Sequence, residues 1–272
     1  MAYQLIALDI DGTLLNSRKE VPADVSAAIR AACAAGKTVV FDTGRAVSEL
    51  TELFTLLPEV RYAVSASGGG LYDAREHRTF GLCPIPETQI RRILSVARTK
   101  DVMPQLVLPV EDVIQESHME NLEHYRMGIY RPLYEKAMTL VPDIYVFAES
   151  CREPVLKLNL YHTNPEERIL TRGQLETPEL EMVYSEVTSL ESSAAGVNKG
   201  SGLERLCGLL GIPISECIAV GDADNDLPML KAAGLGVAMG NAAEHIKAAA
   251  DRVVSDCDHG GCAEAVRMLL DE

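Results

Sequence analysis

The stretch LIALDIDGTL at residues 5–14 is an apolar run that ends in two carboxylates and a glycine. It is short and rich in residues that suit β structure, which predicts a buried strand of a parallel sheet. Since side chains two apart in a strand share a face, we expect Asp9 and Asp11 to leave its carboxyl end together. Ligands bind at that end of strands in open α/β sheets, so the pair indicates a Mg²⁺ site or a carboxylate nucleophile. The alternative is a pair of solvated turn aspartates, which Asp-Gly alone would favour.

Strand and helix patterns alternate outward from this stretch. A helix is predicted over residues 23–35, a strand over 37–42, a second helix to about residue 57, and a strand over 62–66. This alternation is typical of βαβ units and a parallel sheet, so the predicted fold class is α/β with a Rossmann-like core.

The pattern changes after a hairpin near residues 71–82. Sequential strand pairs with intervening helices indicate an α+β module, and the βα alternation resumes near Val197. We therefore expect a discontinuous core domain, residues 1–82 and 191–272, interrupted by an inserted α+β domain at residues 83–190.

Composition excludes several classes of protein. The chain has 272 residues, 47% of them hydrophobic, and a formal net charge of −15, which supports a packed globular protein. Nucleic-acid and anionic-membrane binders need a basic surface, so neither partner is expected. Seven scattered cysteines without a Cys-x-x-Cys pair, and no signal-peptide or membrane-spanning pattern, predict reduced thiols and a cytoplasmic location.

Three further polar stretches follow predicted strands or begin helices. Thr43-Gly44-Arg45 offers a hydroxyl and free backbone N–H groups to a phosphate, although an ordinary helix cap would look the same. Lys199 at a helix start opposes the helix dipole, which favours an anionic partner, although most lysines are solvated. In GDADND at residues 221–226, Asp222 and Asp226 share a face and would repel one another without a cation; an acid-rich helix start is the alternative.

All four stretches are expected at one edge of one sheet, and together they resemble the four motifs of the haloacid dehalogenase (HAD) superfamily of phosphohydrolases. The insertion resembles the type II α/β cap of its Cof-type branch. So does the stretch AGLGVAMGNA at residues 233–242. The resemblance covers nearly the whole chain and is weakest in the cap.

The resemblance implies a catalytic role for each matching residue. Asp9 would be the nucleophile that forms an aspartyl-phosphate, and Asp11 would protonate the leaving oxygen and then activate water. Lys199 would neutralise charge on the nucleophile and the phosphate. The residues implied in phosphate binding are Thr43, Gly44, Lys199 and Asn225.

The resemblance also implies a Mg²⁺ cofactor. Its protein ligands would be Asp9, Asp11 and Asp222, with Asp11 contributing its backbone carbonyl. Asp226 would support the metal or hold Lys199.

Two stretches depart from the family pattern. Many relatives carry Asn-Gly-Ala after the third strand, where this chain has Ser67-Gly68-Gly69, so the role of the asparagine is not carried over to Ser67. The acidic Gly-Val stretch near the end of the chain is replaced here by DCDHGGC at residues 256–262. Arg45, Lys157, Arg126 and Arg131 are candidate substrate contacts, but ordinary surface charge is the better explanation of each.

The function implied is a Mg²⁺-dependent phosphomonoesterase for a small metabolite, such as a sugar phosphate, FMN or pyridoxal phosphate, in a monomer or small homo-oligomer. A sugar phosphomutase is an alternative within the same chemistry. A non-catalytic sensor of a phosphorylated ligand is a third possibility, which the presence of Asp9, Asp11, Lys199 and Asp222 disfavours.

Overall fold

A computed structural model describes residues 3–270; Met1, Ala2, Asp271 and Glu272, which the expected core ranges include, lie outside it. The chain forms two compact units. Unit 1 comprises Met1–Gly44, Glu52–Gly81 and Asn198–Glu272, and unit 2 comprises Arg45–Thr51 and Leu82–Val197.

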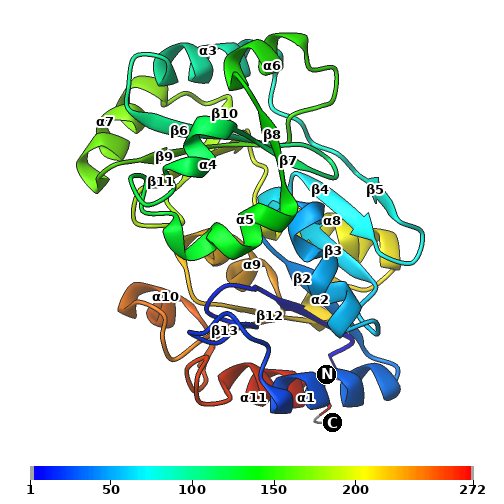
Figure 1. Ribbon diagram of the computed structural model, residues 1–272. Coiled ribbons are helices and arrows are strands. Elements are labelled where there is room, and N and C mark those ends of the chain that lie inside the picture. The colour runs from blue at the N-terminus through cyan, green and yellow to red at the C-terminus, as the bar shows by residue number, and fades with distance from the viewer. Residues whose placement is uncertain (1–2, 271–272) are drawn as a thin grey trace. The chain divides into compact units, whose positions relative to one another are not determined.

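Unit 1 is built on an eight-stranded sheet of order β14-β13-β12-β1-β2-β3-β4-β5 (Figure 1). The six strands from β14 to β3 run parallel, and β4 and β5 add an antiparallel hairpin, as the sequence predicts. The strands are β1 (Leu5–Leu8), β2 (Thr38–Asp42), β3 (Tyr62–Ser65), β4 (Gly70–Asp73), β5 (Arg78–Phe80), β12 (Cys217–Gly221), β13 (Leu235–Ala238) and β14 (Arg252–Val253).

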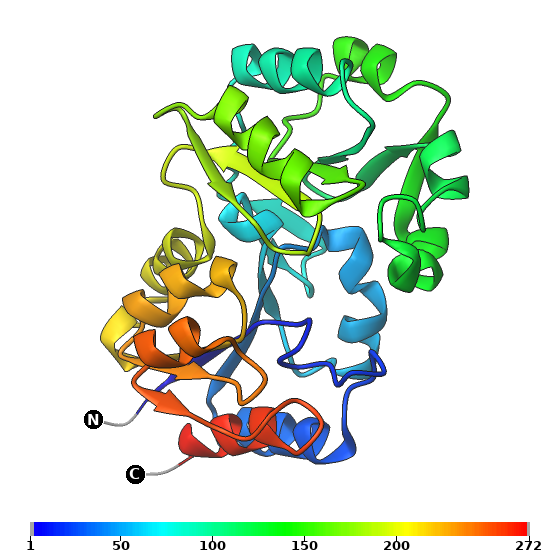
Figure 2. The same ribbon diagram turned by 90° about the vertical axis from the view of Figure 1, so that its left-hand side faces the viewer.

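Helices of unit 1 cover this sheet. They are α1 (Ala23–Ala34), α2 (Thr51–Leu56), α8 (Lys199–Leu210), α9 (Leu227–Ala232), α10 (Glu244–Ala249) and α11 (Gly261–Met268). The first and last of them, α1 and α11, lie side by side in both views (Figure 2). On the sheet itself, Leu5 and Ala7 pack into one buried cluster with Leu203 and Leu206 of α8. Strand alternation then places Asp9 toward that same helix.

The central strand β1 is shorter than expected, because it ends at Leu8. Asp9 still continues the ladder, since its backbone N–H donates to the Val220 carbonyl. Asp11 lies beyond the strand, in a turn that closes with an isolated bridge to Leu15. The strand argument therefore holds for Asp9, but it does not fix the direction of the Asp11 side chain.

Unit 2 contains a six-stranded sheet of order β10-β11-β9-β6-β7-β8, antiparallel except between β7 and β8. Its strands are β6 (Val102–Val107), β7 (Asp112–Gln115), β8 (Met138–Val141), β9 (Lys157–His162), β10 (Leu180–Val183) and β11 (Ser189–Ala194). Its helices are α3 (Glu87–Ala97), α4 (Glu116–Glu120), α5 (Arg131–Ala137), α6 (Ile144–Ser150) and α7 (Pro165–Leu175), with 3-10 turns η1 (Val47–Leu50) and η3 (Gly128–Tyr130).

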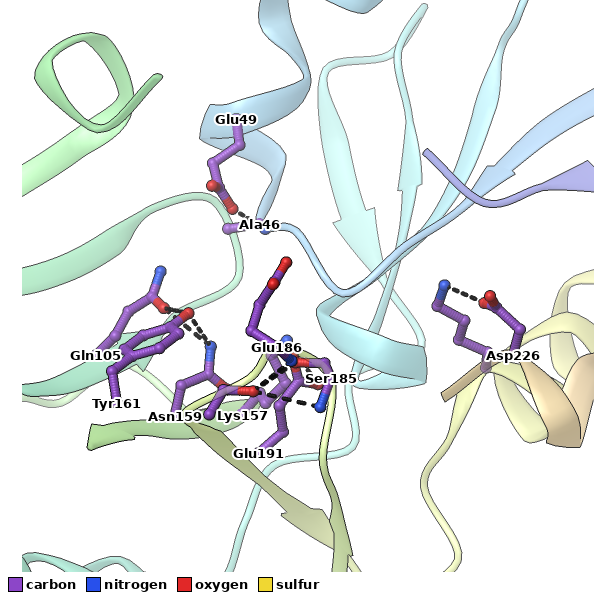
Figure 3. A network of polar contacts seen from close by, with 12 residues as sticks. Ala46, Glu49, Gln105, Lys157, Asn159, Tyr161, Ser185, Glu186, Glu191 and Asp226 are labelled. Carbon is purple, nitrogen blue, oxygen red and sulfur yellow. Dashed lines mark hydrogen bonds and ion pairs between the residues drawn. The ribbon is translucent and has the colours of Figure 1, made fainter. Parts of the chain in front are cut away.

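The two faces of the unit 2 sheet differ in chemistry. Leu158 and Leu160 of β9 pack into an apolar cluster with Ile93 of α3, Ile144 of α6 and Leu175 of α7. The alternate residues of β9 lie on the opposite face, and they are polar and buried (Figure 3).

The division of the chain differs from the expected boundaries in two ways. The expected boundary between residues 190 and 191 falls inside β11, which pairs with β9 and β10 and therefore belongs to unit 2. The structure divides the chain between Val197 and Asn198 instead. In addition, residues 45–51 group with unit 2, although unit 1 flanks them on both sides in the sequence.

No helix among residues 3–270 combines the length and apolar character that a membrane span requires.

Candidate active site

Asp9 lies where the buried strand β1 ends and is itself buried. Its Oδ1 accepts a hydrogen bond from Lys199 Nζ at 2.5 Å. Burial and the nearby carboxylates of Asp226 and Asp222 raise the pKa of Asp9 well above its usual value, while Lys199 acts in the opposite direction. The ammonium group is therefore the neighbour that favours the ionised form of Asp9.

Lys199 is the first residue of α8, and its side chain is completely buried. Its Nζ contacts both Asp9 and Asp226, the latter at 2.6 Å. Burial alone would lower the pKa of Lys199, but the carboxylates of Asp226 and Asp9 outweigh burial and raise it. The anionic partners that a lysine at a helix N-terminus needs are thus supplied by the protein itself.

Asp226 holds Lys199 and the turn that carries Asp222. One carboxylate oxygen, Oδ1, accepts from Lys199, and the other, Oδ2, accepts from the backbone N–H groups of Asp222 and Ala223 at 2.8 and 2.9 Å. Both oxygens of Asp226 are therefore engaged with protein donors. Of the two roles that the resemblance implies for Asp226, holding Lys199 corresponds to a contact in the structure, and supporting the metal stays a prediction.

Asp222 is positioned by donors from two distant parts of the chain. Thr13 Oγ1 donates to its Oδ1 at 3.2 Å, and Asn241 Nδ2 donates to its Oδ2 at 3.0 Å. Burial, followed by the charge of Asp226, raises the pKa of Asp222 to about 7. Gly12 has φ of +83°, and its backbone lies close to the Asp222 carboxylate. A Cβ atom added at position 12 would lie 2.4 Å from Asp222 Oδ2, so only glycine fits there.

The side chains of Asp9, Asp222 and Asp226 each place a carboxylate oxygen within 4.8 Å of the others. Clustered carboxylate oxygens suit a hard divalent cation. Asp9 and Asp222 are the better candidates to bind the metal, because the oxygens of Asp226 already accept from Lys199 and two backbone N–H groups. The donor set therefore fits a cation such as Mg²⁺.

The Asp11 carboxylate stands apart from this cluster of described residues. Its Oδ1 accepts from Lys19 Nζ at 2.8 Å, and both side chains are partly exposed. This placement is compatible with a proton donor that must exchange protons with solvent, and any metal contact of Asp11 would come from its backbone carbonyl.

The Thr43 loop is fixed against the loop that follows β3. Thr43 is buried at the end of β2, and its carbonyl accepts from the Ser67 backbone N–H at 2.9 Å. Ala66 and Ser67 have positive φ angles of 51° and 53°, which is uncommon for residues with side chains and clusters at functional sites. Gly44 follows Thr43 in the chain, and Asn225 lies half-buried in the 3-10 turn η5 (Asp224–Asp226).

Two residues of the site were not identified from the sequence. Asn241 bridges the Gly12 carbonyl, at 2.9 Å, and the Asp222 carboxylate, while its own Oδ1 accepts from the Cys257 N–H. Asp42 is completely buried behind Lys199, and neither carboxylate oxygen has a hydrogen-bond partner. The sequence did offer a signal for Asp42, which lies directly before Thr43. Strand alternation places Asp42 with Val40 on the face of the sheet that α8 covers.

Comparison with known proteins agrees with this geometry. The family model of haloacid dehalogenase-like hydrolases matches residues 6–266. The chain belongs to this family. Phosphatase YwpJ of Bacillus subtilis is 31% identical, with 98% of this chain and 100% of that protein covered. A solved haloacid dehalogenase-like hydrolase from B. subtilis has a TM-score of 0.86 at 28% identity, covering 97% of this chain and 99% of that one.

The comparison confirms the resemblance to HAD phosphatases and the α/β fold class. A second relative, the 5-amino-6-(5-phospho-D-ribitylamino)uracil phosphatase YcsE of B. subtilis, is 29% identical over 97% of this chain and 94% of that protein. The protein is thus a HAD-type phosphatase.

Proposed function

We propose that the protein is a Mg²⁺-dependent phosphomonoesterase that works through an aspartyl-phosphate on Asp9. The observation that carries the proposal is the buried Asp9 carboxylate, in contact with Lys199 and close to the Asp222 carboxylate. A carboxylate at a strand end can act as a nucleophile, and an ammonium group beside it offsets repulsion between two anions.

Each side chain then has one task. An oxygen of Asp9 attacks phosphorus, the bond to the leaving oxygen breaks, and Asp11 gives that oxygen its proton. Asp11 next takes a proton from water, and the resulting hydroxide attacks phosphorus, which releases phosphate and restores Asp9. Thr43 and the N–H of Gly44 bind phosphoryl oxygens, with Asn225 near them.

Mg²⁺ held by Asp9, Asp222 and the Asp11 carbonyl would supply Lewis-acid charge stabilisation. Lys199 contributes a fixed positive charge whose position Asp226 sets before substrate binds, so little reorganisation is required during the reaction.

The substrate class we propose is a small phosphorylated metabolite, such as a sugar phosphate, FMN or pyridoxal phosphate. Support comes from the relatives, whose names include a phosphatase of a phosphoribitylamino pyrimidine and an HMP-PP phosphatase from Serratia proteamaculans.

The proposal is tested by phosphate release from a panel of such metabolites, with Mg²⁺ and with EDTA. We expect metal-dependent release that falls by at least about 10³-fold in Asp9→Asn, because the amide is a poor nucleophile. The exposed acid Asp101, in unit 2, provides the matched control Asp101→Asn, which should retain the wild-type rate. Absence of release from every compound by the folded wild type with Mg²⁺ would refute the proposal.

A further inference from the structure

A surface cavity of about 660 Å³ opens in unit 1 at the edge of the sheet opposite the candidate active site. Its lining includes Lys37, which directly precedes β2, and Arg61, which directly precedes β3. Asp9 and Thr43 follow the carboxyl ends of β1 and β2, and these three strands run parallel. Because the amino and carboxyl ends of parallel strands lie at opposite edges of a sheet, this cavity is separate from the Asp9 cluster.

The lining of this cavity is basic, although the chain as a whole is acidic. Among the described residues that line it, Glu59 is the single carboxylate, and the basic side chains are Arg30 of α1, Lys37, Arg61 and Arg75, the last in the turn between β4 and β5. The whole chain, by contrast, has 25 lysines and arginines and 40 aspartates and glutamates. Charge of one sign gathered in a concave site attracts ligands of the opposite charge.

Two of the guanidinium groups are held in position by carboxylates. Arg61 donates to Asp73 through Nε at 3.0 Å and through Nη2 at 2.7 Å. Arg30 Nε lies 3.4 Å from Glu59 Oε1, and its Nη2 donates to the Leu56 carbonyl at 3.3 Å. No contact within residues 3–270 uses the Nη1 group of either arginine. The ion pairs therefore orient these arginines and leave donors for a ligand.

Lys37 and Arg75 supply positive charge that no carboxylate neutralises. Lys37 Nζ donates to the Tyr3 carbonyl at 2.6 Å, so two of its three N–H groups remain. In the described part of the chain, no carboxylate forms an ion pair with Lys37 or with the exposed Arg75 side chain. The carboxylates of Glu59 and Asp73 offset two of the four basic groups, which leaves an excess of two positive charges.

Local structure explains only part of this excess. Basic side chains are favoured near a helix C-terminus, which accounts for Arg30 and Lys37 beside the end of α1 at Ala34. Arg75 comes from a different element and has no such role. Its neighbour in the turn, Glu76, lines a separate hollow together with Arg78.

We propose that this cavity binds a compact anion that carries two or more negative charges, such as inorganic phosphate or a phosphate chain. Guanidinium groups bind phosphate oxygens through paired N–H donors, and the Lys37 ammonium adds a point charge. The volume lies within the range of small-molecule sites and leaves room for more than one phosphate group. This binding function goes beyond the proposed hydrolysis and does not depend on it.

The experiment is calorimetric titration of the full chain with inorganic phosphate and with inorganic tripolyphosphate, in EDTA and at one low ionic strength. Low salt is used because exposed charges are screened at high salt. We expect tripolyphosphate to bind with Kd below about 1 mM and more tightly than phosphate, since it can contact more of the basic groups.

Variants locate the binding. Lys37→Gln combined with Arg75→Gln should weaken the binding of tripolyphosphate by at least about tenfold, because charge-assisted hydrogen bonds are lost. Arg75→Glu alone reverses a charge on an exposed turn, where folding is least affected, and should weaken binding as well. Lys231→Gln combined with Arg252→Gln removes the same charge from exposed positions elsewhere in unit 1 and should keep the wild-type Kd.

The outcomes separate this site from the Asp9 cluster. The inference is overturned if the wild type binds no tripolyphosphate up to 1 mM, or if the cavity variants keep the wild-type Kd, as they would if the anion bound only beside Asp9. Equal weakening in the cavity and control double variants would also overturn it. Hydrolysis of p-nitrophenyl phosphate with Mg²⁺ should be unchanged in the cavity variants. A wild type that binds tripolyphosphate here but hydrolyses no ester would refute only the phosphatase proposal.

Discussion

The Asp42 carboxyl group is the least compensated polar group near the site. It is completely buried, its oxygens lack hydrogen-bond partners, and burial raises its pKa well above the usual value despite the nearby Lys199. Such a group is held in its neutral form, because ionising it inside the protein without a partner is costly. Asp42 therefore destabilises the native state relative to the unfolded state at any pH where its carboxyl group is ionised in the unfolded chain.

This argument predicts how stability depends on pH at Asp42. The native pKa lies above the unfolded value, so the native state binds more protons and wild-type stability falls as pH rises from about 4 through the native pKa. Asp42→Asn removes this loss. The free energy of unfolding of the variant, relative to wild type, should increase by up to about 1.4 kcal/mol per pH unit within that window.

Urea unfolding at pH 5 and pH 8 measures this difference. Glu204→Gln, on the exposed side of α8, is the control and should show a smaller change between the two pH values. A stability difference between Asp42→Asn and wild type that is the same at both pH values would contradict a raised pKa.

At the residue scale, the acids and the lysine of the candidate site were easier to predict from the sequence than the residues that position them. Asp9, Lys199, Asp222 and Asp226 each follow a strand or begin a helix, and the structure brings them together. Asn241 was not predicted as a site residue, because its partner Gly12 is 229 residues away in the sequence and no local pattern indicates such a contact. Asp11 was placed by strand alternation, which ceased to apply when the strand ended at Leu8.

Among the elements, the loop after β3 and the start of α8 are mutually dependent. Gly68, in the 3-10 turn η2 (Ala66–Gly68), has φ of +93°, and a Cβ atom there would lie 2.1 Å from the Asn198 carbonyl oxygen. Asn198 caps α8, whose next residue is Lys199. Because position 68 has no side chain, the start of α8 can approach the loop that follows β3.

Gly68→Ala should therefore destabilise the protein by about 2–4 kcal/mol, because it combines an unfavourable φ with a clash against backbone. Gly208→Ala is the matched control within α8: nothing lies within 4 Å of its added Cβ, and alanine favours the helix by about 0.5–1 kcal/mol. Thermal unfolding of both variants measures these opposite effects. Equal stability of Gly68→Ala and wild type would show that the helix start adjusts freely.

Elements with a mixed pattern were the hardest to anticipate. The strand β11 has the sequence SLESSA, in which buried serines and a glutamate take the place of the usual apolar residues, so it was not identified. The strand β8 (MTLV) was not identified from the sequence either. In unit 1, by contrast, apolar runs that end at acids or glycines predicted the parallel strands correctly, because those strands are buried on both faces.

At the scale of the whole molecule, the seven residues 45–51 belong with unit 2 although they follow the Thr43 loop of unit 1. They contribute the buried residues Val47, Glu49 and Leu50, and Glu49 also accepts from the Ala46 N–H at 3.0 Å. A fragment of residues 82–197 would therefore lack part of its own core.

We expect that fragment to be less stable than the same unit within the full chain, with Tyr134 and Asp112 losing their neighbour Glu49. Hydrogen exchange measured on the fragment and on the intact protein tests this at α5 and β7, which should exchange faster in the fragment. Addition of a peptide spanning residues 45–51 should slow it again. Equal protection in the fragment and the full chain would show that unit 2 is complete without the segment.

The same seven residues restrict how unit 2 could be exchanged between proteins. A chimera with one pair of junctions, near residues 82 and 197, would replace most of unit 2 but keep the original residues 45–51. Those residues would then have to pack against a foreign insert. A working exchange of unit 2 is therefore expected to require a second, short graft at residues 45–51, which a separate part of the gene encodes.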